Sequence, residues 1–345
     1  MGKDSVHSLD HRKLSDFLEK NLPETGALEE ISKFGTGQSN PTYQLRTTTG
    51  KYVLRKKPPG KLLPSAHAVD REYRIIKALE KTSVPVPRTR MLCNDEDIIG
   101  TIFYLMDYVD GKIHWDPTLP DVSSSDRNDI YGQTVDVLAA LHSIDVGKEG
   151  LLDFGKPGNY FQRQVGRWIK QYKAAQTEEY KEIESLIAWL EKNMPEDDGM
   201  ISIVHGDYRL YNMIFSRTEN KILAVLDWEL STIGHPYADL AYQCMNWHIP
   251  KIGITPGLYG LNLDETGIPT ENEYVDAYCQ KMEINNIPNW SFYLAFGFFR
   301  LAGIAQGVYK RSIMGNASAD NAQELGAAVP LLGKIALSII DRENV

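Results

Sequence analysis

Two short runs of the sequence, HGDYRLYN at residues 205–212 and LDWE at residues 226–229, contain residue types that suit phosphoryl transfer from ATP. That reaction needs a carboxylate that orients the attacking hydroxyl and accepts its proton, oxygen ligands for magnesium, and donors around the phosphates. Asp207 fits the first role. Asn212, five residues later, and Asp227, at the end of an expected strand, fit the second.

Each of these residues also has an ordinary structural explanation. A single Asp or Asn near a turn is more often a cap or a turn former than a ligand, and an HGD tripeptide alone carries little weight. The joint pattern is more specific, because it combines a strand, HGD, an Asn at plus five, two further strands and a terminal Asp. It therefore predicts a kinase-like reaction centre, provided that the surrounding elements agree.

The elements that must position these residues change character near residues 107–112. Before that point the hydrophobic periodicity predicts two helices, near 10–20 and 65–81, and five strands, near 31–34, 43–47, 52–55, 88–93 and 98–106. After it, helices are expected from a cap at 123–125 and at 158–174, 177–193 and much of the chain from 237 on, with short strands at 201–204, 213–216 and 222–226. A β-rich part is thus followed by a mainly helical part.

The HGDxxxxN run followed by a strand that ends in Asp resembles the aminoglycoside phosphotransferase and choline kinase family, a relative of the protein kinases with their HRDxxxxN and DFG motifs. The resemblance covers about residues 25–310, and residues 205–241 are most similar to the kinase-like domains fused to acyl-CoA dehydrogenases. It implies an α+β, bilobal protein-kinase-like fold. A small antiparallel sheet with one helix would occupy residues 1–106, a hinge 107–112, and a larger, mainly helical lobe 113–345.

The same resemblance implies roles for individual residues. Asp207 would be the catalytic base, and Asn212 and Asp227 would hold magnesium. Arg209 lies two residues after the base, where protein kinases often carry a lysine that faces the γ-phosphate, and it would stabilise charge on the transferred group. Asp239 matches a carboxylate that braces the catalytic loop.

A glycine-containing loop in the first part suits the phosphates of ATP. Gly35, Gly37 and Asn40 lie between two expected strands, whereas a Rossmann glycine loop leads from a strand into a helix. The segment is therefore interpreted as a hairpin loop over the phosphates. Alone it is a weak signal, since loops rich in Gly, Ser and Asn are common turns, and it departs from the protein-kinase GxGxxG.

The third strand should supply a cation to the α- and β-phosphates. Arg55 occupies the position where lysine is usual, and arginine can bind phosphate through two donors. Glu72, on the following helix, would pair with it. Lys56 is the alternative cation, although strand alternation directs it to the opposite face, and a solvated basic cluster at 55–57 is a further explanation.

The segment 103–111 resembles the hinge between kinase lobes. Backbone groups of Asp107 and Val109 would then hydrogen-bond adenine, an inference that rests on position because side-chain identity matters little there.

The acceptor is expected to be a small molecule. The stretch from Asp227 to Asp239 leaves no room for a long activation loop, which disfavours a protein substrate. An aminoglycoside or amino alcohol would suit acidic and aromatic linings, whereas the likeness to dehydrogenase-fused domains suggests a hydroxylated acyl chain as its CoA thioester. For the latter, Arg300 is the basic contact to examine; its ordinary explanation is a surface salt bridge.

Composition excludes some other partners. A formal net charge of −9 argues against a broad nucleic-acid footprint. Three scattered cysteines and a polar N-terminus favour a reducing, cytoplasmic setting, and the apolar run at 292–309 contains an arginine and three glycines, so a buried helix is expected there rather than a membrane span. The oligomeric state is left open.

Two other functions compete with the kinase hypothesis. An inactive nucleotide-binding module is suggested by arginine at the lysine position, although Asp207, Asn212 and Asp227 are all present. A metal-dependent hydrolase would draw its ligands from another set, namely His205, Asp207, Asp227, His235 and His248. The histidines lack the paired spacing that metal ligands usually show.

Overall fold

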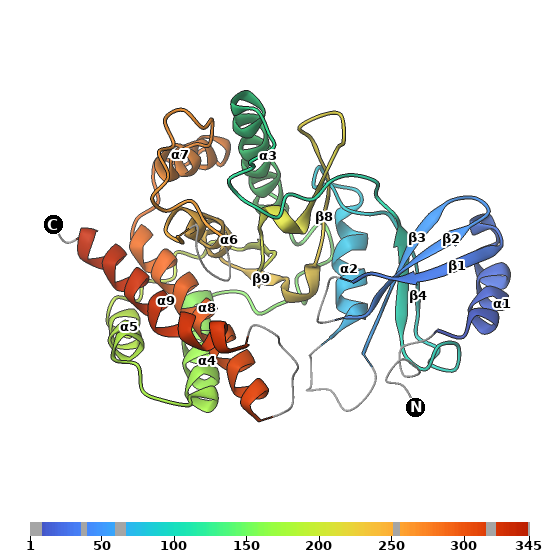
Figure 1. Cartoon of the computed structure of the whole chain (residues 1–345), viewed down its shortest axis with the longest axis horizontal. Coiled ribbons are helices and arrows are strands. Elements are labelled where there is room, and N and C mark those ends of the chain that lie inside the picture. Colours follow the sequence, from blue (N-terminus) through green and yellow to red (C-terminus); the bar gives the residue numbers. More distant parts are fainter. Residues whose placement is uncertain (1–8, 36–39, 59–66, 251–255, 315–321, 344–345) are drawn as a thin grey trace. The chain divides into compact units, whose positions relative to one another are not determined.

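The computed structural model describes residues 9–35, 40–58, 67–250, 256–314 and 322–343 (Figure 1). The chain divides into two units: unit 1 comprises Met1–Lys112 and Leu223–Ser231, and unit 2 comprises Ile113–Ile222 and Thr232–Val345. The domain limits expected from the sequence kept residues 113–345 together. The segment 223–231 instead belongs to unit 1, where the N–H of Val225 donates to the carbonyl of Pro85 (2.8 Å).

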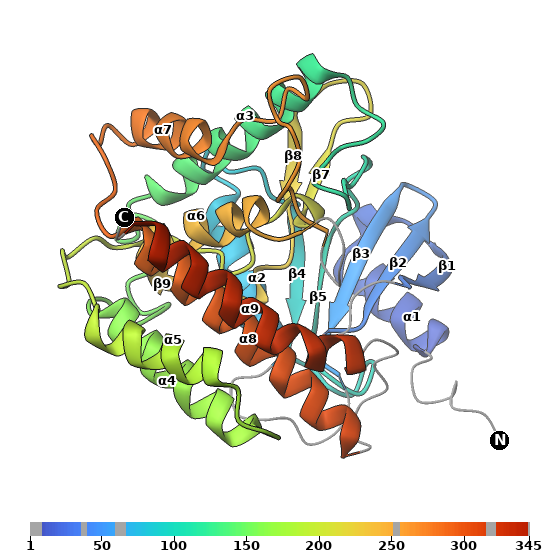
Figure 2. The same ribbon diagram turned by 60° about the vertical axis from the view of Figure 1, so that its left-hand side comes forward.

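Unit 1 is built on an antiparallel five-stranded sheet with the order β1-β2-β3-β5-β4 (Figure 2). Its strands are β1 (Leu28–Lys33), β2 (Thr42–Thr47), β3 (Lys51–Lys56), β4 (Thr89–Cys93) and β5 (Phe103–Asp107). Its helical elements are α1 (His11–Asn21), η2 (Pro23–Thr25), α2 (Val69–Leu79) and η4 (Trp228–Leu230). The five expected strands are therefore present, and most of their ends differ from the expected ones by a few residues.

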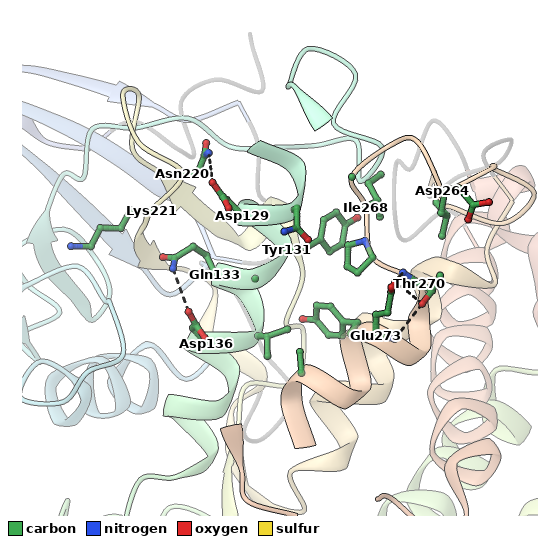
Figure 3. Close-up of a pocket in the computed structure, with 18 residues that line it drawn as sticks. Asp129, Tyr131, Gln133, Asp136, Asn220, Lys221, Asp264, Ile268, Thr270 and Glu273 are labelled. Atoms are coloured by element: carbon green, nitrogen blue, oxygen red, sulfur yellow. Dashed lines mark hydrogen bonds between the residues drawn. The ribbon is translucent and has the colours of Figure 1, made fainter. Parts of the chain in front are cut away.

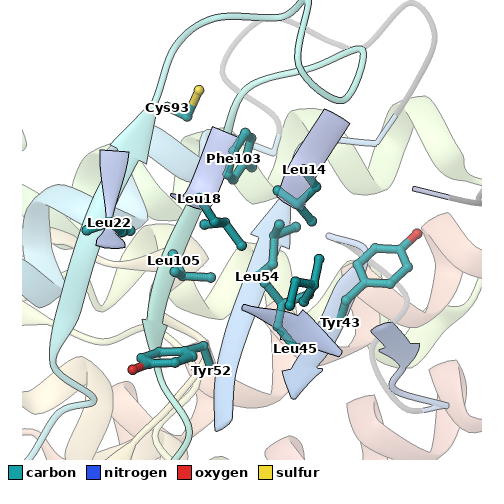
Figure 4. Packing of buried hydrophobic residues seen from close by; sticks show 11 residues of the cluster. Leu14, Leu18, Leu22, Tyr43, Leu45, Tyr52, Leu54, Cys93, Phe103 and Leu105 are labelled. Carbon is teal, nitrogen blue, oxygen red and sulfur yellow. The ribbon is translucent and has the colours of Figure 1, made fainter. Parts of the chain in front are cut away.

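Side chains alternate along β3 between a hydrophobic cluster on one face of the sheet and Arg55 on the opposite face. Tyr52 and Leu54 belong to a buried cluster that Leu14 and Leu18 of α1 complete (Figure 4). Burying one such leucine side chain contributes about 1.5–3 kcal/mol. Because side chains alternate along a strand, Arg55 lies on the other face, where α2 packs against β4 and β5. The sheet thus holds Arg55 rigidly toward α2.

Unit 2 consists mainly of helices. They are α3 (Ser124–His142), α4 (Tyr160–Ala175), α5 (Lys181–Lys192), α6 (Tyr237–Cys244), α7 (Glu271–Lys281), α8 (Trp290–Ile313) and α9 (Ala322–Glu343), with η3 (Leu210–Asn212) and η5 (Met245–Trp247). Figure 2 shows α8 and α9 running alongside each other, and α8 also packs against α4, α5 and α6. The expected cap of α3 is present, since the Ser123 hydroxyl accepts the N–H of Asp126 (3.1 Å).

Short strands flank the HGDYRLYN and LDWE runs. β6 (Ser202–Val204) pairs antiparallel with β9 (Thr232–Gly234), a strand that the sequence patterns did not indicate. β7 (Met213–Phe215) lies in unit 2, whereas β8 (Ile222–Val225) begins in unit 2 and ends in unit 1. Together with the helices they confirm the expected α+β class, with the helices concentrated after the sheet.

Two helices, α8 and α9, are long and apolar enough to cross a membrane by length and composition alone. Buried core helices pass the same test, and the apolar window of α8 is 72% buried within the structure. This agrees with the expectation of a buried helix at 292–309.

Candidate active site

The loop that follows β6 is fixed by a buried carboxylate. Asp239, in the first turn of α6, accepts the N–H groups of His205 (2.6 Å) and Gly206 (2.8 Å). Gly206 has φ +87°, a left-handed conformation that glycine adopts without a Cβ penalty. Burial alone would raise the pKa of Asp239, but His142, His205 and the accepted N–H groups hold it below the ordinary value. Asp239 is therefore ionised and braces the loop.

Asn212 positions the predicted base. Its Nδ2 donates to Oδ2 of Asp207 (2.9 Å) and to the backbone carbonyl of the same residue (2.9 Å). The N–H of Asp207 donates to Nδ1 of His205 (3.1 Å). η3 brings Asn212 back to the loop, so a spacing of five residues becomes a direct contact. This contact fixes one carboxylate oxygen of Asp207.

Arg209 is a buried cation beside this carboxylate. Its Nε lies 3.6 Å from Oδ1 of Asp207, and its guanidinium carbon lies 4.1 Å from the ring centroid of Tyr242 and 5.9 Å from that of Tyr211. Burial would lower the pKa of Arg209, but the two tyrosines and Asp207 raise it, so the side chain stays charged. Among the described residues, neither Nε nor Nη2 has a hydrogen-bond partner.

Arg300, a residue of α8, supports the loop that follows β6. Its Nη2 donates to the carbonyl of Gly206, and its guanidinium carbon lies 4.9 Å from the ring centroid of Tyr242. From the sequence, Arg300 was expected to contact the acceptor or to form a surface salt bridge. The structure gives this 8% exposed side chain a different partner, which sequence reasoning missed because the two residues are 94 positions apart.

In unit 1, Arg55 is surrounded by three carboxylates. Its Nη2 lies 2.6 Å from Oδ1 of Asp227 and 3.4 Å from Oε2 of Glu229, and its Nε lies 2.9 Å from Oε2 of Glu72. The contact with Glu72, which the sequence predicted, pairs the charges without an aligned hydrogen bond. Burial would lower the pKa of Arg55, but the carboxylates raise it, whereas burial raises the pKa of Glu72 to about 7.

Asp227 has an unusual backbone conformation. It has φ 64° and ψ 54°, the left-handed region that few residues other than glycine adopt, although Asp tolerates it better than most. η4 follows at once and brings Glu229 to the same arginine. Such outliers concentrate at functional sites. Sequence reasoning assigned no role to Glu229, although its position as a second carboxylate two residues after Asp227 was a possible signal.

The predicted phosphate loop is partly described. Gly35 lies in a bend after β1, whereas Gly37 lies outside the described residues. Nδ2 of Asn40 donates to Oε2 of Glu229 (3.3 Å), and Oδ1 of Asn40 lies 3.0 Å from Nδ1 of His67. The structure thus connects Asn40 to the group around Arg55.

The two predicted adenine contacts lie at the end of β5 and after it. The N–H of Asp107 donates to the carbonyl of Arg88 (2.8 Å), and its carboxylate accepts from both Nε and Nη2 of Arg90 (2.6 and 3.0 Å). Adenine would therefore meet the carbonyl of Asp107 rather than its N–H. Val109 is half-buried beyond the strand. Lys56, the alternative to Arg55, is buried beneath Tyr43, 5.9 Å from its ring centroid.

Two histidines of the hydrolase hypothesis pair with carboxylates outside its proposed ligand set. His235 pairs with Asp198 (3.1 Å) and His248 with Glu271 (2.8 Å). In the part of the chain that the structure describes, no group of three or more His, Cys, Asp or Glu side chains could hold a metal by itself. A histidine-based metal centre therefore has no support.

A separate cavity of about 990 Å³ in unit 2 contains none of the predicted residues (Figure 3). Asp129 and Asp136 of α3 and Glu273 of α7 are among the carboxylates on its walls. Glu273 completes the N-terminal capping box of α7, and the other two side chains are exposed. Ordinary surface and capping roles account for these groups.

An antiparallel five-stranded sheet, a mainly helical second unit and an HGDxxxxN loop define a protein-kinase-like phosphotransferase. The model of the phosphotransferase enzyme family matches residues 30–256. A solved Ralstonia eutropha protein assigned to the aminoglycoside phosphotransferases is 43% identical, with a TM-score of 0.88, covering 97% of this chain and 99% of that one. The chain belongs to the phosphotransferase enzyme family.

Curated relatives are longer proteins. Mouse acyl-CoA dehydrogenase family member 10 is 47% identical over 336 residues, which is 95% of this chain and 31% of the relative. The probable acyl-CoA dehydrogenase IBR3 of Arabidopsis thaliana is 43% identical, covering 99% of this chain and 44% of that protein. The chain thus spans less than half the length of these relatives.

A more distant structure shares the fold. The aminoglycoside phosphotransferase APH(4)-Ia, solved with AMP-PNP and hygromycin B, is 12% identical with a TM-score of 0.59, and covers 94% of this chain and 98% of that one. The likeness supports the protein-kinase-like architecture.

Proposed function

We propose that this phosphotransferase uses MgATP and moves the γ-phosphoryl group onto a hydroxyl of a small molecule. The observation that carries the proposal is the anchoring of Asp207: Asn212 binds one of its oxygens, and Asp239 holds the loop on which it lies. A carboxylate fixed in this way can orient a hydroxyl and accept its proton. Membership of the phosphotransferase family supports this interpretation.

The proposed nucleotide contacts lie mainly in unit 1. Arg55 would bind the α- and β-phosphates and Glu72 would hold it in place, with Gly35 and Asn40 over the phosphates. Gly37, also predicted in this loop, lies outside the described residues. The backbone of Asp107 and Val109 would bind adenine. Since Nε and Nη2 of Arg55 face three carboxylates, a phosphate oxygen that binds either of these nitrogens would replace one of these partners.

The donors of this chain fit magnesium. Magnesium prefers oxygen ligands and usually takes one or two carboxylates together with substrate phosphates. Asp227 offers a 35% exposed carboxylate, and Asn212 keeps its amide oxygen because Nδ2 donates to Asp207. When bound, the metal would neutralise charge on the phosphates.

The proposed reaction is a single displacement. The acceptor hydroxyl oxygen bonds to the γ-phosphorus, the bond from that phosphorus to the β,γ-bridging oxygen breaks, and ADP leaves. Asp207 accepts the hydroxyl proton, and Arg209 stabilises charge beside it. A general base contributes about 10²–10⁴-fold to such rates.

Two acceptor classes are compatible with the comparisons. The hygromycin B complex of a distant neighbour suggests an aminoglycoside or amino alcohol. The acyl-CoA dehydrogenase names of the curated relatives instead suggest a hydroxylated acyl chain carried as its CoA thioester.

The proposal is tested by transfer from MgATP to a panel of aminoglycosides, amino alcohols, sugars and hydroxyacyl-CoAs. Transfer to one class by the wild type, together with its loss in Asp207→Asn and retained ATP binding, is the expected result. Full turnover by Asp207→Asn would exclude Asp207 as the base. ATP binding without transfer or hydrolysis would favour an inactive nucleotide-binding module.

A further inference from the structure

Arg209 lines a small pocket in unit 2. The pocket has a volume of about 230 Å³, and its other walls come from Trp115, Pro117, Leu210, Tyr211, Asn246 and Pro256. Arg209 is only 3% exposed, and Nε and Nη2 have no hydrogen-bond partner among the described residues. A buried donor without a partner destabilises the fold. Such groups call for an explanation, and a ligand that accepts from them is one.

Tyr211 and Tyr242 interact with the guanidinium of Arg209 and stabilise its charge, but Nε and Nη2 have no aligned hydrogen bond to any described residue. The nearest carboxylate oxygen, on Asp207, is 3.6 Å from Nε, which is too far for a hydrogen bond. The ring of Tyr242 lies against the guanidinium and provides a cation–π contact. An oxygen acceptor from outside the chain would complete the site, because arginine presents its donors in a planar fork that matches a carboxylate.

The rest of the pocket is mostly apolar. The rings of Trp115 and Tyr211 are stacked, with centroids 6.2 Å apart and planes 12° from parallel, and Trp115 is 58% exposed. Two prolines and Leu210 complete these walls. A hydrocarbon segment fits such a surface better than a polycation does, since a buried guanidinium repels added positive charge.

We propose that Arg209 binds a carbonyl or carboxylate oxygen of the acceptor while Asp207 binds its hydroxyl, so that the acceptors are hydroxylated carboxylic acids or their thioesters. This rests on the proposed function. With one hydrogen bond to each residue, the two acceptor oxygens lie no more than roughly 9 Å apart, so one small molecule reaches both. Arg209 then acts on the acceptor rather than chiefly on the γ-phosphate, the role suggested by its position in the sequence.

The test compares straight-chain hydroxyalkanoic acids, their CoA thioesters and diols of the same length that lack a carbonyl. We expect the Arg209→Gln variant to raise KM for whichever carbonyl compound is used by about 10–100-fold, the usual range for a hydrogen bond to a charged group. KM for MgATP should stay unchanged, and the diols should be poor substrates of both proteins. If the free acid is the better substrate, Arg209 binds a carboxylate oxygen. If the thioester is the better substrate, Arg209 binds its carbonyl oxygen.

Two further variants guard against misfolding and non-specific effects. Arg209→Lys keeps the charge and should lie between the wild type and Arg209→Gln, and Arg167→Gln alters an exposed arginine of the same unit and should change nothing. If Arg209→Gln instead lowered kcat equally for acids and diols at unchanged KM, Arg209 would act on the phosphoryl group, and the inference would be wrong.

Direct binding separates this inference from the catalytic proposal. The emission of Trp115 should change on titration with the hydroxy acids or thioesters, and Trp115→Phe identifies the signal. Binding that is lost in Arg209→Gln, without any transfer by the wild type, would support the inference and contradict the proposed reaction. Equal binding of diols and carbonyl compounds, or no binding of either, would overturn the inference.

Discussion

Arg55 and Arg209, the two arginines with predicted roles, differ in the charge of the side chains around them. In unit 1, Arg55 has three carboxylates within 3.4 Å and its side chain is 14% exposed. In unit 2, the side chain of Arg209 is 4% exposed, lies against the ring of Tyr242 and has one carboxylate oxygen, on Asp207, 3.6 Å from Nε. Arg55 is already surrounded by negative charge, whereas Nε and Nη2 of Arg209 have no hydrogen-bond partner in the described part of the chain.

This difference indicates different tasks. A phosphate that binds Nε or Nη2 of Arg55 displaces a carboxylate, so nucleotide binding should depend on magnesium to hold the displaced negative charge. Arg209 needs no such exchange, because its donors are preorganised and cost no reorganisation when an acceptor oxygen arrives. Substitutions in the two regions should therefore affect different substrates.

The largest effect is expected from Asp227→Ala. This change removes a proposed magnesium ligand and a partner of Arg55 together. MgATP affinity should fall by at least about 100-fold, since even indirect supports of a metal site are worth 10–100-fold. Binding of ATP without magnesium should change much less. Calorimetric titration with and without magnesium measures both, and Asp16→Ala, an exposed change on α1, is the control. Equal loss in both titrations would contradict the metal role.

The Arg55→Lys variant tests whether Arg55 acts on the nucleotide and not on the acceptor. Lysine keeps the counter-charge of buried Glu72 but loses the fork that reaches two carboxylates. KM for MgATP should rise by about tenfold, the value of roughly one charged hydrogen bond, while KM for the acceptor stays constant. Steady-state kinetics with each substrate varied gives the answer. A change in KM for the acceptor alone would contradict the assignment of Arg55 to the nucleotide and Arg209 to the acceptor.

Arg300→Met tests the support of the loop. The change removes the donor to the Gly206 carbonyl while keeping most of the side-chain volume. We expect kcat to fall by about tenfold, because misplacing a base of this kind can cost up to 10²-fold, with KM for MgATP unchanged. Arg300→Lys should recover part of kcat. A loss of thermal stability with unchanged kcat would show that Arg300 contributes to packing and not to catalysis.

Glu72→Gln should have the smallest effect, and it should depend on pH. The pKa of Glu72 rises from its ordinary value of 4.5 to about 7 in the folded protein. Between these values the folded state binds more protons than the unfolded state, so stability falls as the pH rises. The free energy of unfolding of the wild type, relative to Glu72→Gln, should drop by on the order of 3 kcal/mol across this range.

Urea unfolding at pH 4.5 and 7.5 measures this difference. Glu265→Gln, an exposed change in unit 2, is the control that should show no pH dependence relative to the wild type. A constant difference between the wild type and Glu72→Gln at both pH values would show that burial does not raise the pKa of Glu72.

Local patterns predicted much of this arrangement. Strand alternation separated Arg55 from Lys56, because it depends only on neighbours along the chain. The pairing of Glu72 with Arg55 was instead predicted from the resemblance to kinases. The contact of Arg300 with Gly206 joins α8 to a loop 94 residues earlier, and no local period encodes that distance. The same limit explains why Glu229 and the association of residues 223–231 with unit 1 were missed.

The central claim is that the acceptor hydroxyl attacks the γ-phosphorus. An acceptor labelled with ¹⁸O at its hydroxyl, incubated with MgATP, tests this by mass spectrometry of the product. The account predicts a phosphate ester that retains the label, formed with one ADP per ester, and its absence with Asp207→Asn. ADP released with inorganic phosphate that takes its new oxygen from water, and no labelled ester, would contradict the claim.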